Sequence, residues 1–202
     1  MCSARGRPGL GKSELDKRVL AVMRDVPRHL FVPSPVAPAA YEDTPLPIGF
    51  NKTISQPFMV ALMTDLLDPQ PTDNVLEVGT GLGYQTAILA RLVAQVWSVE
   101  VVEEFAESAR ERLKRIAVEN VELRVGDGSR GWPEHAPYDK VLVAAGAKEV
   151  PTALIAQLKP GGRLVMPLGP AEDQRLSVVK KAAGDSLETR GIMPVRFSEL
   201  ET

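Results

Sequence analysis

Cysteine is nearly missing from this sequence, which has one, Cys2, among 202 residues. A single cysteine cannot close a disulfide within the chain, so a small secreted fold held by disulfides is excluded. Long apolar runs are missing too. No stretch of about 18 apolar residues is present to cross a bilayer, and the first residues lack the apolar core of a secretory signal peptide. We therefore expect a cytoplasmic protein with no membrane partner.

Neither charge sign is in large excess, with 24 Lys and Arg against 26 Asp and Glu. The basic residues are spread along the chain, so an extended nucleic-acid surface is not expected. Histidine is also scarce. His29 and His135 are not spaced as metal ligands and belong to no arrangement of nucleophile and base, so we expect no metal site and interpret both as structural or exposed. No apolar stripe indicates an interface, and we expect a monomer.

What the sequence does contain is a regular alternation of elements after a proline-rich segment. Prolines cluster between residues 27 and 57 and exclude regular helix there. Ser13 and Asp16 form a capping-box pattern before a helix predicted over residues 14–25. From residue 57 onward a parallel sheet is predicted, with helices at 84–93, 103–118 and 151–158, a helix carrying Phe58 and Leu62, and strands at 75–78, 96–99, 121–125, 140–144 and 163–166.

Two final strands, near residues 175–181 and 189–197, are predicted to form an antiparallel hairpin at one sheet edge. The chain length suits one domain. We predict a single three-layer α/β domain with a mostly parallel seven-stranded sheet. In it, residues 1–57 form a helix and loop on the substrate side, and residues 58–202 form the cofactor-binding core.

A glycine-rich turn follows the first predicted strand, where Glu77 precedes Gly79, Gly81 and Gly83. Glycines between a strand and a helix let the backbone approach a ligand closely. The dinucleotide fingerprint would need a glycine where Tyr84 stands, so a nicotinamide or flavin cofactor fits less well. An acidic residue followed by G-x-G-x-G resembles the first motif of class I methyltransferases. This resemblance implies their Rossmann-like fold, with S-adenosyl-L-methionine as the cofactor.

Two further acidic residues lie at predicted strand ends. Glu100 ends the second strand, where a carboxylate can accept hydrogen bonds from both ribose hydroxyls. Asp127 follows the next strand and, by the same resemblance, faces the adenine amino group. Glu100 is also interpretable as an exposed strand end, and Asp127 as a turn residue. Their order along the chain favours a cofactor site made of Glu77, Gly79, Thr80, Gly81, Gly83, Tyr84, Glu100, Asp127 and Gly128.

A second glycine pattern, from Gly6 to Ser13, matches the phosphate loop G-x-x-x-x-G-K-[ST]. That loop needs a buried strand leading into it so that backbone N–H groups converge on the phosphates. Only Met1 to Arg5 precede it, which leaves no room for such a strand. We interpret the segment as a basic tail in which Ser13 caps the first helix.

The proline-rich segment resembles the N-terminal half of protein-L-isoaspartate O-methyltransferases. The resemblance runs through residues 26–33, 40–43, 46–49 and 53–57 and continues to the end of the chain, through Gly126-Asp127-Gly128, residues 157–162 and residues 195–200. Its most specific part is Thr53-Ile54-Ser55-Gln56-Pro57. Such an enzyme transfers a methyl group from S-adenosylmethionine to the free α-carboxylate of L-isoaspartyl residues in damaged proteins, and repair then proceeds through a succinimide.

The resemblance implies that Ser55 is the catalytic residue. The acceptor carboxylate is ionised at neutral pH, so no general base is required, and Ser55 has only to orient it. A serine before Pro57 and an apolar helix is also a good N-cap, and the two roles are compatible. The predicted substrate contacts are Ile48, Gly49, Thr53, Ile54, Gln56 and Ala144.

Several points stay open at this stage. Lys52 stands where the family more often has glutamine, and it either attracts a carboxylate substrate or points to solvent. Arg28 either pairs with a carboxylate or is solvated. Two other functions also fit: a methyltransferase acting on RNA or a small molecule, which should lack the Thr53 to Pro57 motif, and a non-catalytic module that binds a partner protein.

Overall fold

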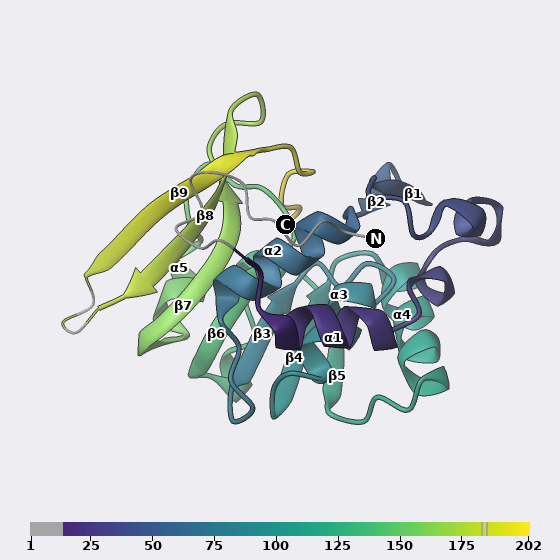
Figure 1. Cartoon of the computed structure of the whole chain (residues 1–202). Coiled ribbons are helices and arrows are strands. Elements are labelled where there is room, and N and C mark those ends of the chain that lie inside the picture. The colour runs from purple at the N-terminus through teal and green to yellow at the C-terminus, as the bar shows by residue number, and fades with distance from the viewer. Residues whose placement is uncertain (1–13, 183, 185) are drawn as a thin grey trace.

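The first helix begins later than predicted. The computed structural model describes residues 14–182, 184 and 186–202 (Figure 1). Helix α1 spans Lys17–Asp25, and Asp16 caps it by accepting a hydrogen bond from the Arg18 backbone N–H at 2.7 Å. The capping role expected of Ser13 and the phosphate-loop pattern from Gly6 lie outside the described residues.

The proline-rich segment forms short 3-10 turns and a hairpin. The turns η1 (Arg28–Phe31) and η2 (Ser34–Ala39) replace regular helix, as predicted. The antiparallel hairpin of β1 (Leu46–Gly49) and β2 (Lys52–Ile54) was not predicted. Its tip holds Phe50 and Asn51 at φ 50° and 55°, a left-handed conformation that sequence patterns associate with Asn-Gly pairs. A phenylalanine at this position gives no turn signal.

The main sheet has seven strands in the order β5-β4-β3-β6-β7-β8-β9. Neighbours from β5 to β7 are parallel, and β8 is antiparallel to both β7 and β9, which confirms the predicted sheet and its terminal hairpin. The strands are β3 (Asn74–Val78), β4 (Gln95–Glu100), β5 (Val121–Val125), β6 (Tyr138–Val143), β7 (Leu158–Leu168), β8 (Gln174–Lys181) and β9 (Leu187–Val195).

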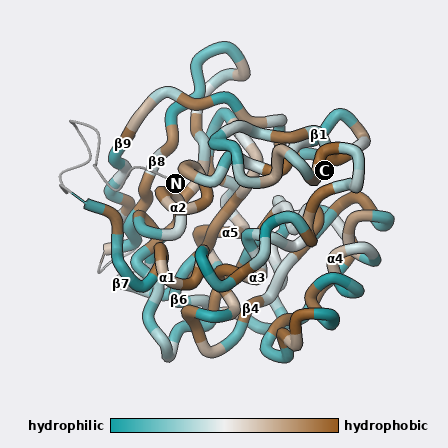
Figure 2. Tube along the Cα trace, turned by 45° about the vertical axis from the view of Figure 1, so that its right-hand side comes forward, coloured by the Kyte–Doolittle hydropathy of each residue, from teal (hydrophilic) through white to brown (hydrophobic). Residues whose placement is uncertain are grey.

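Hydrophobic clusters cover both faces of the sheet. Side chains alternate along a strand, so Val75 of β3 packs with one cluster while Leu76 and Val78 pack with the other. The first cluster includes α1, α2 (Pro57–Leu67), α3 (Tyr84–Ala90) and α4 (Glu103–Arg115). The second includes α5 (Thr152–Ala156). Brown and teal alternate along α4 in Figure 2, as an amphipathic helix requires. The three layers agree with the predicted fold class.

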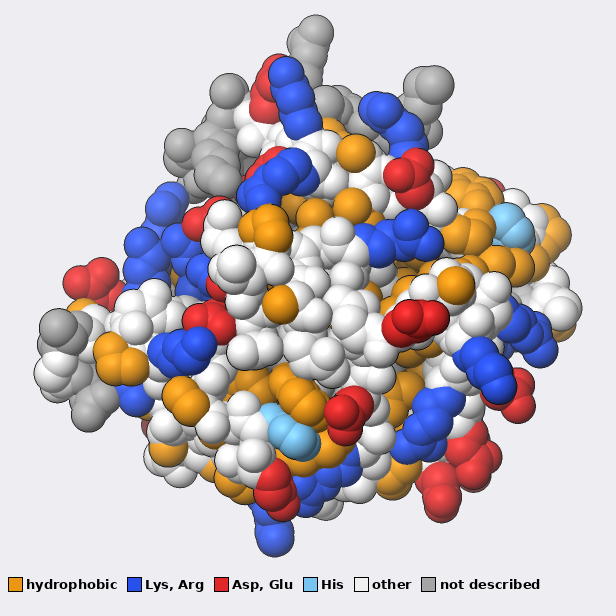
Figure 3. Space-filling model, turned by 90° about the horizontal axis from the view of Figure 1, so that it is seen from below, with side chains coloured by type: hydrophobic (Ala, Val, Ile, Leu, Met, Phe, Trp, Pro, Cys, Tyr) orange, Lys and Arg blue, Asp and Glu red, His pale blue; other side chains and the backbone are white. Residues whose placement is uncertain are grey.

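The first hydrophobic cluster joins the two predicted parts of the chain. Val19 of α1 and Phe31 of η1 pack in it together with residues of the α/β core. On the surface, Lys and Arg side chains are interspersed with Asp and Glu over the face seen in Figure 3. Across the described part of the chain, no helix is both long and apolar enough to cross a membrane.

The strand order places a crevice beside β3. The chain runs from β3 outward to β4 and β5, and β6 then returns to the other side of β3. Connections on the two sides leave the carboxyl ends of β3 and β6 in opposite directions. In open α/β sheets a ligand binds outside the strand ends at such a switch point.

Candidate active site

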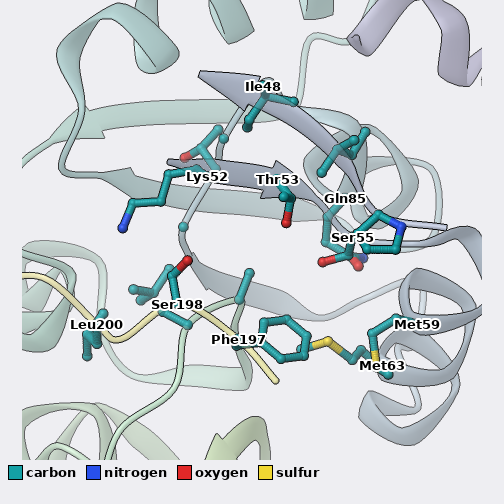
Figure 4. A pocket seen from close by; sticks show the side chains of 18 of the residues that line it. Ile48, Lys52, Thr53, Ser55, Met59, Met63, Gln85, Phe197, Ser198 and Leu200 are labelled. Atoms are coloured by element: carbon teal, nitrogen blue, oxygen red, sulfur yellow. The ribbon is translucent and has the colours of Figure 1, made fainter. Parts of the chain in front are cut away.

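A cavity of about 430 Å³ lies at this switch point, within the size range of small-molecule sites. The turn after β3, the end of β4, the start of α2 and the β1–β2 hairpin all contribute to its wall. In Figure 4, Thr53, Ser55 and Gln85 lie on one side, and Phe197, Ser198 and Leu200 lie opposite. The cavity therefore brings together the predicted cofactor loop and the predicted substrate segment.

The glycine turn is shaped by close contacts on both of its sides. Gly79 has φ 92°, and a Cβ there would lie 3.4 Å from the Cβ of Ala144, the residue that follows β6. Gly83 has the same φ, and a Cβ there would lie 3.2 Å from the Cβ of Ala109 in α4. Gly79, Thr80, Gly81 and Tyr84 line the cavity, as does Ala144. Gly83 instead allows α4 to pack closely against the start of α3.

Glu77 lies beneath the turn and is fully buried. Its Oε2 accepts hydrogen bonds of 2.6 Å from the hydroxyls of Thr86 in α3 and Ser98 in β4. The Ser98 hydroxyl also lies 2.6 Å from that of Thr80. Burial raises the pKa of Glu77 to about 7, against the opposing effect of the two hydroxyls. Glu77 is not among the residues that line the cavity. Its hydrogen bonds support the turn from beneath, and a direct contact between Glu77 and the cofactor stays a prediction.

Glu100 lines the cavity at the end of β4. Its Oε2 accepts a 2.7 Å hydrogen bond from the Gly81 N–H, and its Oε1 accepts a 3.0 Å bond from the Val102 N–H. These bonds fix the carboxylate and tie the glycine turn to β4. A carboxylate has about four acceptor sites, so Glu100 keeps acceptor capacity for ligand hydroxyls.

The carboxylate of Asp127 accepts hydrogen bonds from residues of its own turn. Its Oδ1 accepts bonds from the Ser129 N–H (2.9 Å) and hydroxyl (2.6 Å), and its Oδ2 accepts one from Arg130 Nε at 3.1 Å. The Ser129 hydroxyl is the main cause of a lowered Asp127 pKa. Gly128 lines the cavity, whereas Asp127 is not among the lining residues. A contact between Asp127 and adenine stays a prediction.

Ser55 lies between β2 and α2 and lines the cavity. The expectation that it caps α2 is wrong: the N-cap is Gln56, which makes no side-chain cap bond, and the Phe58 N–H donates to Asp43 Oδ1 at 2.8 Å. Asp43 satisfies the helix terminus from the neighbouring loop, so the Ser55 hydroxyl is not needed there. Ile48, Thr53, Ile54 and Gln56 line the same cavity, whereas Gly49 is not among the lining residues.

The opposite wall was missed by sequence reasoning. Strand β9 ends at Val195, two residues before the predicted end, and the chain then turns along the cavity through Glu201. Gln174 exchanges hydrogen bonds with the Phe197 backbone, and Gly146 does so with Ser198 and Leu200. No local pattern marks such a wall, because its position depends on contacts with β8 and with the turn after β6.

Three residues considered as possible functional groups, His29, His135 and Arg28, are not among the residues that line the cavity. His29 Nδ1 is 2.6 Å from the Tyr41 hydroxyl, and the ring of His135 stacks on Trp97 with centroids 3.4 Å apart. Arg28 is 1% exposed, which contradicts a solvated position. Its Nε donates to the Ala40 carbonyl at 2.8 Å, its guanidinium lies 5.0 Å from the Tyr84 ring centroid, and burial lowers its pKa. Within the described ranges, no group of three or more His, Cys, Asp or Glu is arranged to hold a metal ion.

Comparisons with known proteins agree with this geometry. A family model described as protein-L-isoaspartate(D-aspartate) O-methyltransferase matches residues 11–201. The chain is 58% identical over 192 residues to protein-L-isoaspartate O-methyltransferase 1 of a Polaromonas species, covering 95% of this chain and 81% of that protein. It is 51% identical to protein-L-isoaspartate O-methyltransferase 2 of Nitrosococcus oceani, covering 95% of this chain and 87% of that protein.

Solved structures give the same fold. A protein-L-isoaspartate O-methyltransferase structure superimposes with a TM-score of 0.85 at 30% identity, covering 93% of this chain and 62% of that chain. A Plasmodium falciparum protein assigned the same activity, solved with S-adenosyl-L-homocysteine, gives a TM-score of 0.79 at 24% identity and covers 92% of this chain and 91% of that chain.

Proposed function

Because the chain belongs to the protein-L-isoaspartate(D-aspartate) O-methyltransferase family, we propose that its cavity holds the methyl donor against an isoaspartyl carboxylate that Ser55 orients. The enzyme is an S-adenosyl-L-methionine-dependent protein carboxyl O-methyltransferase, and it acts on L-isoaspartyl residues of damaged proteins. The observation that carries the site assignment is that Ser55 and the glycine turn line one cavity.

The residues of the cavity fit S-adenosyl-L-methionine. The turn at Gly79 and Gly81 presents bare backbone, and the fixed Glu100 carboxylate keeps acceptor capacity for ribose hydroxyls. Tyr84 extends the wall at the start of α3. When bound, this cofactor supplies an electrophilic methyl group on a positively charged sulfur. We assign Gly79, Thr80, Gly81, Tyr84, Glu100 and Gly128 to the cofactor side, with Glu77 and Gly83 holding the turn in place and Asp127 beside it.

The acceptor side needs alignment more than acid–base chemistry. A carboxylate with an ordinary terminal pKa is already ionised at neutral pH, so its oxygen attacks without a base. Ser55 Oγ donates a hydrogen bond that fixes this carboxylate, and Met59, Met63 and Phe197 exclude water around it. Ile48, Thr53, Ile54, Gln56 and Ala144 shape the surrounding wall, and Gly49 ends the strand that carries Ile48.

The test uses radiolabelled S-adenosyl-L-methionine and two peptides that differ only in carrying L-isoaspartate or normal aspartate at one position. We expect label on the isoaspartyl peptide alone. Cofactor binding without transfer to either peptide would contradict the proposal and favour a non-catalytic module. Transfer to RNA or a small molecule, with neither peptide labelled, would favour a different methyltransferase.

We further propose that the enzyme is a cytoplasmic monomer that does not act on nucleic acid. The exposed large apolar side chains come from separate segments: Leu30, Tyr41, Phe50, Val101, Val125 and Leu187. The near balance of basic and acidic residues disfavours a polyanion as partner. Size-exclusion chromatography with light scattering tests the monomer, and a mass above that of one 21.9 kDa chain would contradict it. Cell fractionation tests the cytoplasmic location.

A further inference from the structure

An ion pair joins two walls of the cavity. Lys52 Nζ, at the start of β2, lies 2.5 Å from Glu201 Oε1 near the end of the chain. Both residues line the cavity, and their side chains are 24% and 54% exposed. The lysine that replaces the family's more frequent glutamine therefore neither points freely to solvent nor lies far from the site. A carboxylate is already bound to it.

That carboxylate lies beyond the backbone hydrogen bonds that hold this wall. Backbone hydrogen bonds fix the chain at Phe197, Ser198 and Leu200, where Gln174 and Gly146 are the partners. Glu201 lies beyond the last of these, and its side chain is held through Lys52. A partly exposed ion pair of this kind is weak and easily exchanged. Another carboxylate entering the cavity can therefore replace Glu201 without breaking these backbone hydrogen bonds.

The exchanged carboxylate is not the methyl acceptor. Ser55 follows Lys52 by three positions and lies one residue beyond the end of β2, and an extended chain rises about 3.3 Å per residue. The two Cα atoms are thus at most about 10 Å apart, the length of roughly three residues of an extended peptide. A peptide whose isoaspartyl carboxylate reaches Ser55 brings a residue two or three positions away to Lys52.

We propose that Glu201 occupies, in the free enzyme, the position of a second substrate carboxylate, and that Lys52 selects damaged sites carrying Asp or Glu two or three residues from the isoaspartate. This inference rests on the proposed function, because it assumes that the cavity takes an isoaspartyl peptide. On binding, the substrate carboxylate pairs with Lys52 and the Glu201 side chain is released to solvent.

The test is kcat/KM for isoaspartyl peptides with Glu or Gln at the second and third positions on either side of the isoaspartate. For the wild type at low ionic strength, we expect the Glu form at the preferred position to exceed the Gln form about threefold, as a partly exposed ion pair allows. About 0.5 M salt should reduce this ratio towards one.

Variants separate charge recognition from structural effects. Lys52→Gln should bring the Glu/Gln ratio close to one, and Lys52→Arg should keep it. Glu201→Gln should increase the ratio, because the internal competitor is removed. Lys180→Gln, which removes the same charge from an exposed position on β8 outside the cavity lining, should leave the ratio at its wild-type value.

Two results would overturn the inference. One is a wild-type ratio of one for every peptide pair. The other is a Glu201→Gln variant that slows both members of each pair equally, which would make the ion pair a structural latch. In either case methyl transfer to isoaspartyl peptides persists and the proposed function stands. If the wild type labels no isoaspartyl peptide at all, the proposed function fails and the inference fails with it.

Discussion

At the scale of single residues, Ser55 has a free hydroxyl where a cap was expected. Asp43 binds the α2 terminus, so within the described structure no backbone group depends on Ser55 for its hydrogen bond. Ser55→Ala should therefore lower kcat about 10-fold to 100-fold, the effect of one hydrogen bond to a charged group. Its Tm should stay within about 1 °C of the wild type. Full turnover by Ser55→Ala, measured with the isoaspartyl peptide, would remove Ser55 from the mechanism.

The raised pKa of Glu77 should make the free energy of unfolding depend on pH. Its pKa is raised from 4.5 to about 7, so the folded state keeps a proton that the unfolded state loses in this window. Stability from the neutral carboxyl is complete below about pH 4.5 and is lost as the pH rises to about 7. Because Glu77→Gln cannot ionise, its free energy of unfolding relative to the wild type should rise by about 2–3 kcal/mol between pH 5 and pH 8. Urea unfolding at both pH values measures this, and a constant difference would contradict it.

At the scale of elements, the start of α2 depends on a loop residue 15 positions earlier in the chain. Asp43→Ala should lower the free energy of unfolding by about 1 kcal/mol, since the Phe58 N–H loses its acceptor. Because α2 carries Met59 and Met63 along the cavity, kcat/KM should fall as well. Asp43→Asn keeps an acceptor and should recover most of the loss. Equal effects of the alanine and asparagine variants in thermal unfolding would exclude the cap.

The contact between α3 and α4 is tested by two glycines of similar backbone conformation. Gly83→Ala and Gly161→Ala both place a side chain at positive φ, 92° and 80°. At Gly83 the new Cβ would also lie 3.2 Å from the Cβ of Ala109. At Gly161 no atom beyond the adjacent residues of the chain lies within 4 Å of the new Cβ. Both should be destabilised by about 1 kcal/mol of backbone strain, and Gly83→Ala by about 1–3 kcal/mol more. Equal losses in urea unfolding would show that close packing on α4 is unimportant.

At the scale of the whole molecule, ligand binding should stabilise the fold. The cavity wall includes residues far apart in the sequence, from Pro45 to Glu201, so a ligand that fills it joins these segments. S-adenosyl-L-homocysteine at 100 times its Kd should add about 2.7 kcal/mol and raise Tm by a few degrees. The interpretation of Gly6 to Ser13 as a segment that does not bind nucleotide predicts that ATP at the same concentration leaves Tm unchanged. A rise in Tm with ATP would restore the phosphate-loop interpretation.

The features that the sequence determined by itself are those that depend on neighbouring residues in the chain. The alternation of apolar segments predicted the seven-stranded sheet and its terminal hairpin, because side-chain periodicity is a property of each strand alone. The glycines at 79, 81 and 83 predicted a ligand-binding turn, because the positive φ at all three positions is a local preference of glycine. The motif from Thr53 to Pro57 identified the family that the comparisons show.

Only the tertiary structure decided which side chains face the cavity and which support it. Glu77 lies beneath the turn, Arg28 is buried against Tyr84, and Asp43 replaces Ser55 at the start of α2. Lys52 meets Glu201 across 149 positions of sequence. Such pairings leave no local pattern, because each depends on how distant segments are brought together when the two hydrophobic clusters form on either face of the sheet.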